Sequence, residues 1–381
     1  MNKFARWFII NNCISTSLSI ILDSIMTFYL LKNGFSLAVI SLCFSISLIT
    51  TTIIEFPSGM IADRFGRKKT YSIGLLFRAT QCLILLLTKN TFLILMSGFF
   101  EGIHNALVSG SLESWLFKEL DDKNYDRLFG LNKICTSIVS FIFVLVIAYL
   151  ISDSKLCILL CFIAYILSAI TNIFYLDDNR DETSSMKATF NTSLDFIKES
   201  KARILMNILI MFYGVISVYM LLFQAIANRI GLEDSFVLLA SLFSLTGSVI
   251  AGYVFSKATK RKELLIMISL IGVSLSFLMF ILARDALLLL IGNILYGFSQ
   301  ASMFPYFYSE LFKILPDQSI ASNISIISAV ASLFAALLTY FLGLITEISS
   351  LTILAFIGVF FAISCVLLIK YIFVKRTNVN A

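Results

Sequence analysis

The stretch GMIADRFGRK, residues Gly59–Lys68, places four charges among ten residues, between long apolar runs. The whole chain has 381 residues, of which 59% are hydrophobic and 14% are charged. Soluble domains carry about 25% charged residues, so a soluble chain of this composition would lack the polar surface to cover itself. The apolar runs reach the about 20 residues that a helix needs to cross a bilayer, and their continuity excludes a β-barrel. The sequence therefore predicts an all-α polytopic membrane protein.

Apolar runs between charged or turn-forming breaks predict twelve membrane-spanning helices. The first six cover about residues 7–31, 36–60, 71–88, 91–116, 129–151 and 155–176, and the second six about 204–227, 234–256, 263–283, 286–312, 319–345 and 350–374. One long polar segment separates the two sets. The predicted organisation is an N-terminal bundle over 1–176, a linker over 177–203 with a short surface helix near 195–201, and a C-terminal bundle over 204–381. The first run lacks a small-residue cleavage site, so we interpret it as a retained span.

Lysine and arginine are distributed unevenly between the two sets of loops. Both termini, the linker and the loops after even-numbered spans hold 22 basic residues, whereas the opposite loops hold 5. Loops rich in lysine and arginine stay in the cytoplasm. The sequence therefore predicts a multi-pass protein of the plasma or inner membrane with both termini cytoplasmic. The net charge of +6 is explained by this topology and does not indicate a nucleic-acid partner.

Three pairs of segments repeat at nearly the same spacing. Residues 102–118 align with residues 297–313 at an offset of 195. The charged stretch aligns with GYVFSKATKR, which begins at Gly252, at an offset of 193, and Ala5-Arg6 aligns with Ala202-Arg203 at 197. Independent pairings near one offset predict two six-helix halves in parallel orientation.

The spacing glycine, three residues, aspartate-arginine, one residue, glycine-arginine-lysine resembles the signature loop of the major facilitator superfamily. The residues that carry the resemblance are Gly59, Asp63, Arg64, Gly66, Arg67 and Lys68. Together with the twelve spans and the repeat, the resemblance covers essentially the whole chain. It implies a major facilitator fold of two pseudo-symmetric six-helix bundles, and a secondary transporter that works by alternating access.

In that family the signature loop latches the cytoplasmic gate. The resemblance implies that Asp63 caps a helix of the other half. It implies that Arg67 pairs with an acid near the cytoplasmic end of span 4, with Glu113 the first candidate and Glu119 the second. Glu55, one turn before Gly59, is interpreted as part of the same network.

Polar residues inside the predicted spans form stripes. Asn12, Thr16, Ser19 and Asp23 share a narrow sector of span 1, and Glu101, Asn105, Ser109 and Glu113 follow span 4 with His104 alongside. In the family, spans 1, 4, 7 and 10 line the central cavity. The resemblance then assigns the facing wall to Tyr213, Ser217, Gln224, Tyr296, Gln300, Tyr306 and Tyr308. Polar contacts between helices, without any cargo, are the alternative interpretation.

Charged groups inside a bilayer are costly and mark functional sites. Asp23 or Glu101 could carry a proton, since burial disfavours a charged carboxylate. Arg78 could instead neutralise one of them, which would make the pair structural. His104, the single histidine of the chain, is a candidate for a proton relay with Glu101. No metal site is predicted, and the seven cysteines are interpreted as packing residues.

Two departures from the drug–proton antiporters of the family leave the direction of transport open. Those antiporters usually carry an arginine four residues before the glycine that Gly102 matches, but Gly98 stands there, and Glu101 stands where glutamine is common. Their glycine-proline element in span 5 is also absent. We predict proton-coupled efflux of a hydrophobic or amphiphilic small molecule or peptide by a monomer in the lipid bilayer, without a cofactor.

Two alternatives remain open. One is uptake of a small metabolite by a symporter or uniporter, and the other is a membrane receptor that transports nothing. An enzyme is not expected, because the chain has one histidine, no nucleotide-binding loop and no clustered catalytic residues.

Overall fold

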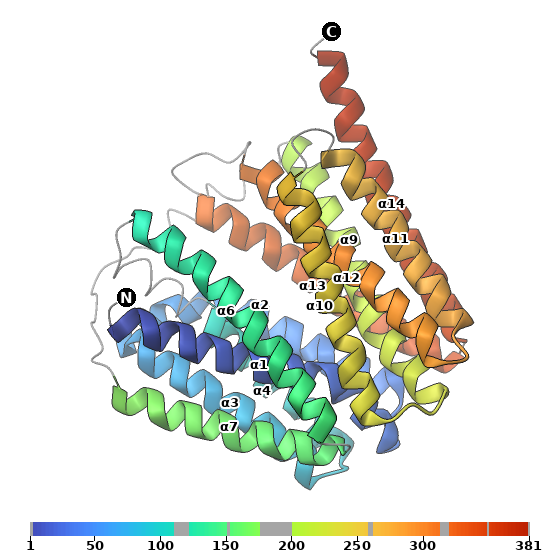
Figure 1. Ribbon diagram of the computed structural model, residues 1–381. Coiled ribbons are helices and arrows are strands. Elements are labelled where there is room, and N and C mark those ends of the chain that lie inside the picture. The colour runs from blue at the N-terminus through green and yellow to red at the C-terminus, as the bar shows by residue number, and fades with distance from the viewer. Residues whose placement is uncertain are drawn as a thin grey trace. The chain divides into compact units, whose positions relative to one another are not determined.

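The computed structural model describes residues 3–109, 122–150, 153–175, 200–257, 262–312, 320–348 and 350–379, and the regular elements within these ranges are helices (Figure 1). The first six are α1 (Lys3–Lys32), α2 (Leu37–Phe65), α3 (Arg67–Leu87), α4 (Thr91–Ser109), α6 (Asp122–Leu150) and α7 (Ser154–Tyr175). The next six are α9 (Ser200–Arg229), α10 (Asp234–Lys257), α11 (Lys262–Leu282), α12 (Ala286–Phe312), α13 (Ile320–Ile348) and α14 (Leu351–Val379).

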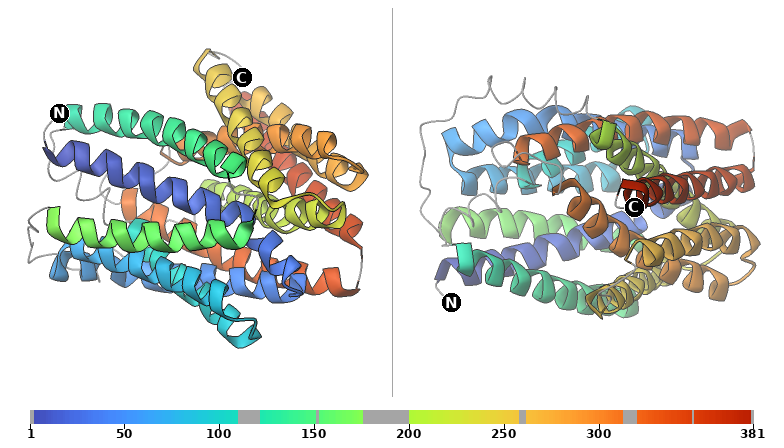
Figure 2. Two further views of the ribbon diagram at one scale, coloured as in Figure 1. Left: turned by 60° about the horizontal axis from the view of Figure 1, so that its bottom comes forward. Right: turned by 90° about the horizontal axis from the view of Figure 1, so that it is seen from above.

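The chain divides into two compact units. Unit 1 contains residues 1–183 together with the short segment Glu233–Leu239, and unit 2 contains residues 184–232 and 240–381. In unit 1, α1 packs against α6 and α7, α3 packs between α7 and α4, and α4 packs against α2. Figure 2 shows these helices in blue to green. Helix α7 contacts both α1 and α3, and α3 contacts α4, so these packed pairs connect α1 to α4 through the unit.

Unit 2 repeats this arrangement with equivalent helices. There α9 packs against α13 and α14, and α11 packs between α14 and α12. The repeat extends to single hydrogen bonds. Thr51 Oγ1 of α2 donates to the carbonyl of Gly102 in α4 at 3.2 Å, and Ser248 Oγ of α10 donates to the carbonyl of Gly297 in α12 at the same distance. For the described part of the chain, the predicted class, twelve helices in two pseudo-symmetric six-helix bundles, is confirmed.

The first helix of each unit ends in the same turn. Gly34 follows α1 with φ 88° and Gly231 follows α9 with φ 73°, a left-handed conformation that glycine adopts without strain. In both turns the amide of the residue after the glycine bonds a carbonyl five residues back, Phe35 to Leu30 and Leu232 to Ala227, each at 3.1 Å. The offset of 197 between the two turns agrees with the sequence repeat.

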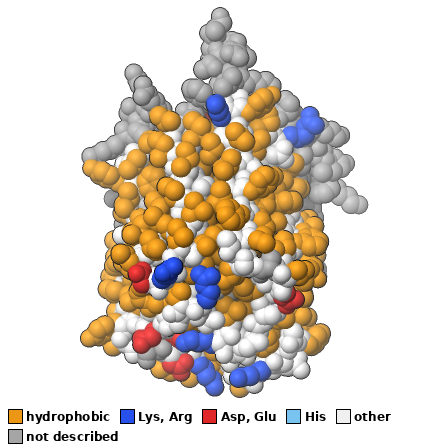
Figure 3. Space-filling view, turned by 90° about the vertical axis from the view of Figure 1, so that its right-hand side faces the viewer, with side chains coloured by type: hydrophobic (Ala, Val, Ile, Leu, Met, Phe, Trp, Pro, Cys, Tyr) orange, Lys and Arg blue, Asp and Glu red, His pale blue; other side chains and the backbone are white. Residues whose placement is uncertain are grey.

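Eleven of the described helices contain windows that are long and apolar enough to cross a membrane. The remaining helix, α6, has a shorter apolar part, Cys135–Leu150, within the residues searched. Large apolar side chains lie exposed on the helix surfaces, for example Leu87 and Phe92. Figure 3 shows one such face, where hydrophobic side chains form a continuous surface. A bilayer is the solvent in which this surface is stable.

The helices extend beyond the predicted spans at their polar ends. The sequence predicts spans over 36–60 and 71–88, but α2 continues to Phe65 and α3 begins at Arg67. The charged stretch is therefore helical on both sides of Gly66 rather than an open loop. Residues 200–203, predicted as linker, are the start of α9. Hydropathy detects only the part of a helix that lies in hydrocarbon, so a helix that continues into water is cut short.

Gly66 forms the connection between α2 and α3. Its φ is 95°, and its carbonyl accepts hydrogen bonds from the amide of Thr70 at 3.0 Å and from the Thr70 hydroxyl at 2.9 Å. Residues with a side chain rarely adopt this combination of positive φ and extended ψ, which costs them about 1–3 kcal/mol. The glycine of the signature is thus required by the backbone itself.

We expect Gly66→Ala to lower the stability of the purified protein by about 1–3 kcal/mol, because alanine at φ 95° and ψ 137° is strained. Thermal unfolding in detergent measures the change. Gly252→Ala in α10, where nothing lies within 4 Å of an added Cβ, is the control and should be as stable as the parent or slightly more. Equal melting temperatures for the two variants would show that the turn tolerates a side chain.

Candidate functional site: a buried charge cluster in unit 1

Arg78 lies at the centre of unit 1 and holds two carboxylates. Its side chain, on α3, is 1% exposed. The Nη2 atom lies 2.5 Å from Asp23 Oδ1 of α1, and the Nη1 atom lies 2.7 Å from Glu101 Oε1 of α4. The three charges come from three helices, α1, α3 and α4, and the long Arg78 side chain joins both acids.

Gln81 completes the cluster one helical turn after Arg78. Its Oε1 accepts a hydrogen bond from Arg78 Nη1 at 2.8 Å, and its Nε2 donates to Glu101 Oε2 at 3.1 Å. The amide therefore fixes both partners of the Arg78–Glu101 ion pair. Gln81 is fully buried, as is expected for a group that satisfies buried charges.

The two carboxylates differ in how far neighbouring side chains cover them. The Asp23 side chain is 42% exposed, whereas that of Glu101 is 8% exposed. With both acids ionised the cluster carries a net charge of −1. Protonation of Asp23 would bring that charge to zero, and the Arg78–Glu101 pair would remain intact. A cluster of this kind can exchange one proton without leaving a buried charge unpaired.

His104 and Tyr165 flank the cluster. His104 of α4 is buried, and its Nδ1–H donates to the backbone carbonyl of Gly74 in α3 at 2.9 Å. Its ring makes an edge contact with the ring of Tyr165 of α7, at 5.9 Å between centroids. The Tyr165 hydroxyl is hydrogen-bonded to Ser19 Oγ of α1 at 3.0 Å. His104 is thus oriented by backbone and aromatic contacts. A proton relay between His104 and Glu101 stays a prediction.

The remaining predicted residues of unit 1 follow α1 and α4 away from the cluster. Asn12 and Thr16, two turns and one turn before Ser19, are half-buried and hydrogen-bonded to each other at 3.3 Å. Asn105 is exposed. The side chain of Ser109, the last residue of α4, lies outside the part of the chain that the structure describes. The predicted stripe on α1 therefore consists of half-buried polar residues, and its contact with a cargo stays a prediction.

The predicted polar residues of unit 2 are mostly paired or packed. Ser217 of α9 accepts a hydrogen bond from Thr339 of α13 at 2.9 Å. Tyr296 of α12 stacks on Tyr219 of α9 at 3.4 Å between centroids, and Tyr213 makes an edge contact with Phe304 at 6.5 Å. Gln224 is buried, Gln300 is half-buried and Tyr306 is buried. The side chain of Tyr308 lies outside the described residues. Contacts between helices account for Ser217 and Tyr296, and their contact with a cargo stays a prediction.

The signature residues occupy the ends of two helices. Gly59, Asp63 and Arg64 belong to the last turns of α2, Gly66 is the turn itself, and Arg67 and Lys68 begin α3. Lys68 is buried, at 7% exposure. The side chains of Asp63, Arg64 and Arg67 lie outside what the structure describes, as do Glu113, Glu119 and most of the predicted linker. Glu55 is exposed on α2. The latch that the resemblance implies stays a prediction.

Sequence reasoning missed Gln81, which belongs to the cluster, and Tyr165, which flanks it. Gln81 stands three residues after Arg78, a spacing that places both on one face of a helix, so this signal was available. Tyr165 stands alone in an apolar span, and tyrosine at such positions usually packs without a functional role. The sequence alone does not show which helices pack beside Tyr165.

Comparisons with known proteins agree with this architecture. The sequence model of the Major Facilitator Superfamily matches residues 8–285. No protein of curated function matches the sequence significantly. Among solved structures, a mutant of the nucleoside transporter NupG is similar with a TM-score of 0.84 at 12% identity, over 97% of this chain and 100% of that one. A POT family transporter in complex with 5-aminolevulinic acid is similar with a TM-score of 0.76 at 11% identity, over 99% of this chain and 96% of that one.

At 11–12% sequence identity, the similarity to these solved structures shows the fold alone. The family match covers more than half of the chain, and it agrees with the repeated six-helix units and with the residues of the signature. This chain belongs to the Major Facilitator Superfamily, a family of multi-pass membrane transporters.

Proposed function

We propose that the protein is a proton-coupled secondary transporter that exports a hydrophobic or amphiphilic small molecule or peptide by alternating access. The observation that carries the proposal is the cluster of Asp23, Arg78 and Glu101, in which one arginine is shared between an accessible and a buried carboxylate. Ionisable residues inside membrane spans that pair with one another are a frequent feature of proton pathways.

The cluster provides a physical basis for coupling. When Asp23 binds a proton it no longer attracts Arg78, so the contact between α1 and α3 weakens while Glu101 still neutralises the arginine. A protonated and an ionised form of the cluster therefore favour different arrangements of these helices. Coupling requires a two-state element of this kind, whose equilibrium the proton biases.

The cluster also restricts the charge of the cargo. With Asp23 ionised, the accessible end of the cluster is negative, so neutral or cationic compounds are favoured over anions. The polar line of Asn12, Thr16 and Ser19 along α1 supplies hydrogen-bonding groups next to this end. We propose this line, Asn105 on α4, and Tyr213, Gln224 and Gln300 in unit 2 as residues that contact cargo.

The signature residues are proposed as the gate that accompanies this cycle. Asp63 and Arg67 would hold one conformational state on the cytoplasmic side, with Glu113 or Glu119 as the partner of Arg67. The sharp turn at Gly66 supports this role, since it fixes the end of α2 and the start of α3 relative to one another. Charge contacts of this kind must break once in each transport cycle.

Transport in oriented membrane vesicles tests the proposed function. Candidate cargo is first found by screening a compound library for thermal stabilisation of the purified protein. Export by proton exchange predicts that everted vesicles with an acidic interior accumulate the compound and that a protonophore abolishes accumulation. Accumulation only in right-side-out vesicles would show uptake instead, and binding without transport in either orientation would indicate a receptor.

A further inference from the structure

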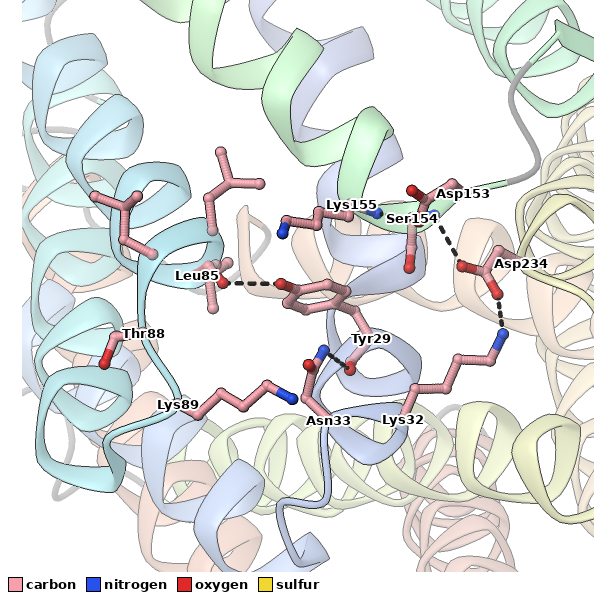
Figure 4. Close-up of a pocket in the computed structure, with 12 residues that line it drawn as sticks. Tyr29, Lys32, Asn33, Leu85, Thr88, Lys89, Asp153, Ser154, Lys155 and Asp234 are labelled. Atoms are coloured by element: carbon pink, nitrogen blue, oxygen red, sulfur yellow. Dashed lines mark hydrogen bonds and ion pairs between the residues drawn. The ribbon is translucent and has the colours of Figure 1, made fainter.

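A second charged region of unit 1 lies at the opposite end of α3 from the signature turn. A pocket of about 520 Å³ is formed where the ends of α1 and α3 meet the start of α7 (Figure 4). Its walls carry three lysines and two aspartates, Lys32, Lys89, Lys155, Asp153 and Asp234. None of these residues takes part in the charge cluster or the gate, so the pocket needs a separate explanation.

One wall of the pocket is fixed by an ion pair, in which the charges of Lys32 and Asp234 neutralise each other. Asp234, which belongs to unit 1, pairs with Lys32 and accepts a hydrogen bond from the amide of Ser154 at 2.8 Å. The Tyr29 hydroxyl donates to the carbonyl of Leu85 at 2.9 Å and ties α1 to α3. Hydrogen bonds and an ion pair therefore hold the walls of the pocket in place.

Two lysines of the pocket keep their charge without a partner. Among the described residues, neither Lys89 nor Lys155 makes an ion pair. Figure 4 shows Lys155 extending past the ring of Tyr29 and Lys89 extending toward Asn33 from a different wall. The carboxylate of Asp153 accepts the backbone N–H of Lys155 at 2.9 Å and so is engaged at the start of α7. The Lys32–Asp234 pair is neutral, so Lys89, Lys155 and the carboxylate of Asp153 leave the pocket with a net charge of +1. An anion suits this pocket.

An apolar groove adjoins the pocket on the outside of the helices. It measures about 390 Å³ and shares Leu86, Leu87, Asp153 and Lys155 with the pocket. The groove continues over Leu83 of α3 and over the first turns of α7, where its lining is Leu156, Leu159 and Phe162. Both helices contain candidate membrane spans, and Leu83, Leu156 and Leu159 are exposed, so the groove opens toward lipid.

We propose that the pocket and the groove together bind one anionic phospholipid. The phosphate lies between Lys89 and Lys155, and one acyl chain follows the groove between α3 and α7. The charge of the pocket alone would suit a free anion, and the groove alone would suit any lipid. The pocket and the groove are continuous, and Lys155 lines both. A ligand that joins a phosphate to an apolar chain therefore fits them together. Lysines at the membrane surface attract anionic lipids in the same way.

Lipid binding to the purified full-length protein tests the proposal. Native mass spectrometry measures the affinities for phosphatidylglycerol and phosphatidylcholine with identical acyl chains. We expect a preference for phosphatidylglycerol, and an about 30-fold loss of its affinity in Lys89→Gln/Lys155→Gln with little change for phosphatidylcholine. Lys89→Arg/Lys155→Arg should keep the preference and shows that the region still folds. Arg284→Gln, an exposed cation of unit 2, is the matched control and should bind as the parent does.

A reporter in the groove tests the position of the acyl chain. Leu159→Trp is made in a background where Trp7 and Trp115 are replaced by phenylalanine, and its fluorescence is followed with brominated lipids. We expect brominated phosphatidylglycerol to quench at lower concentration than brominated phosphatidylcholine, and the two lysine-to-glutamine changes to remove that difference. Unchanged phosphatidylglycerol affinity in the glutamine variant, or equal competition by inorganic phosphate, would overturn the proposal. Neither measurement needs a transported cargo, so the result is independent of the proposed transport.

Discussion

Replacing Arg78 with glutamine is expected to remove most of the folded protein. The arginine forms ion pairs with two carboxylates at once, and Glu101 lies at 8% exposure beside it. Loss of one partner of a buried ion pair costs about 3–5 kcal/mol, because the remaining charge is left without compensation. Such a loss is a large part of the about 5–15 kcal/mol that stabilises a protein. Yield, elution profile and thermal unfolding in mild detergent measure the effect.

A double substitution distinguishes the effect of the unpaired Glu101 charge from the effect of the lost Arg78 side chain. Arg78→Gln/Glu101→Gln removes the buried charge together with its partner, so we expect most of the lost thermal stability to return, although transport should not. Asp23 is 42% exposed and can be hydrated in this variant. If Arg78→Gln alone unfolds at the temperature of the parent protein, the cluster does not stabilise unit 1 and its arrangement as described is wrong.

Placing a methyl group at Gly98 or Gly297 is expected to force two helices apart. An added Cβ at Gly98 of α4 would lie 2.3 Å from the carbonyl oxygen of Cys43 in α2, and one at Gly297 of α12 would lie 1.9 Å from that of Ser244 in α10. Both obstacles are backbone atoms, which cannot turn aside as a side chain can. We expect Gly98→Ala and Gly297→Ala each to cost about 3 kcal/mol, the upper end of overpacking effects, measured by thermal unfolding.

Gly272→Ala provides the matched control for these two variants. Gly272 also lies within a helix, α11, but the nearest atom to an added Cβ is a methyl group of Leu295 at 3.8 Å. Alanine favours helix formation over glycine by about 1 kcal/mol, so this variant should be as stable as the parent or slightly more. Melting temperatures of Gly98→Ala and Gly297→Ala that match the control would contradict the close approach of α2 to α4 and of α10 to α12.

Much of the fold could be predicted from the sequence because it depends on periodic and local signals. The apolar runs, the repeat near an offset of 195 and the signature from Gly59 to Lys68 each report on a stretch of chain that can be inspected by itself. The repeat is visible in the structure as equal turns at Gly34 and Gly231. Helix ends were predicted less well, since α2 and α3 continue through charged residues that hydropathy treats as a loop.

The site was predictable only in part because its contacts join distant helices. Charge in an apolar span singled out Asp23, Arg78 and Glu101, but the sequence left open whether Arg78 pairs with one acid or with none. In the structure it contacts both. Tyr165 and the pairing of Lys32 with Asp234 had no sequence signal, since which helices pack side by side follows from the fold. In unit 2 the sequence singled out Ser217 as a cavity residue. The structure shows that Ser217 of α9 is hydrogen-bonded to Thr339 of α13.

The proposed role of Asp23 in coupling is tested most directly by recording cargo-dependent proton movement across proteoliposomes, with a pH-sensitive dye inside, for the parent protein and for Asp23→Asn. Asparagine keeps the shape of the side chain and cannot exchange a proton. We expect the parent to move protons against the cargo, and Asp23→Asn to exchange labelled for unlabelled cargo while proton movement and uphill accumulation are lost. Proton-driven accumulation that persists in Asp23→Asn would contradict the assignment of coupling to this cluster.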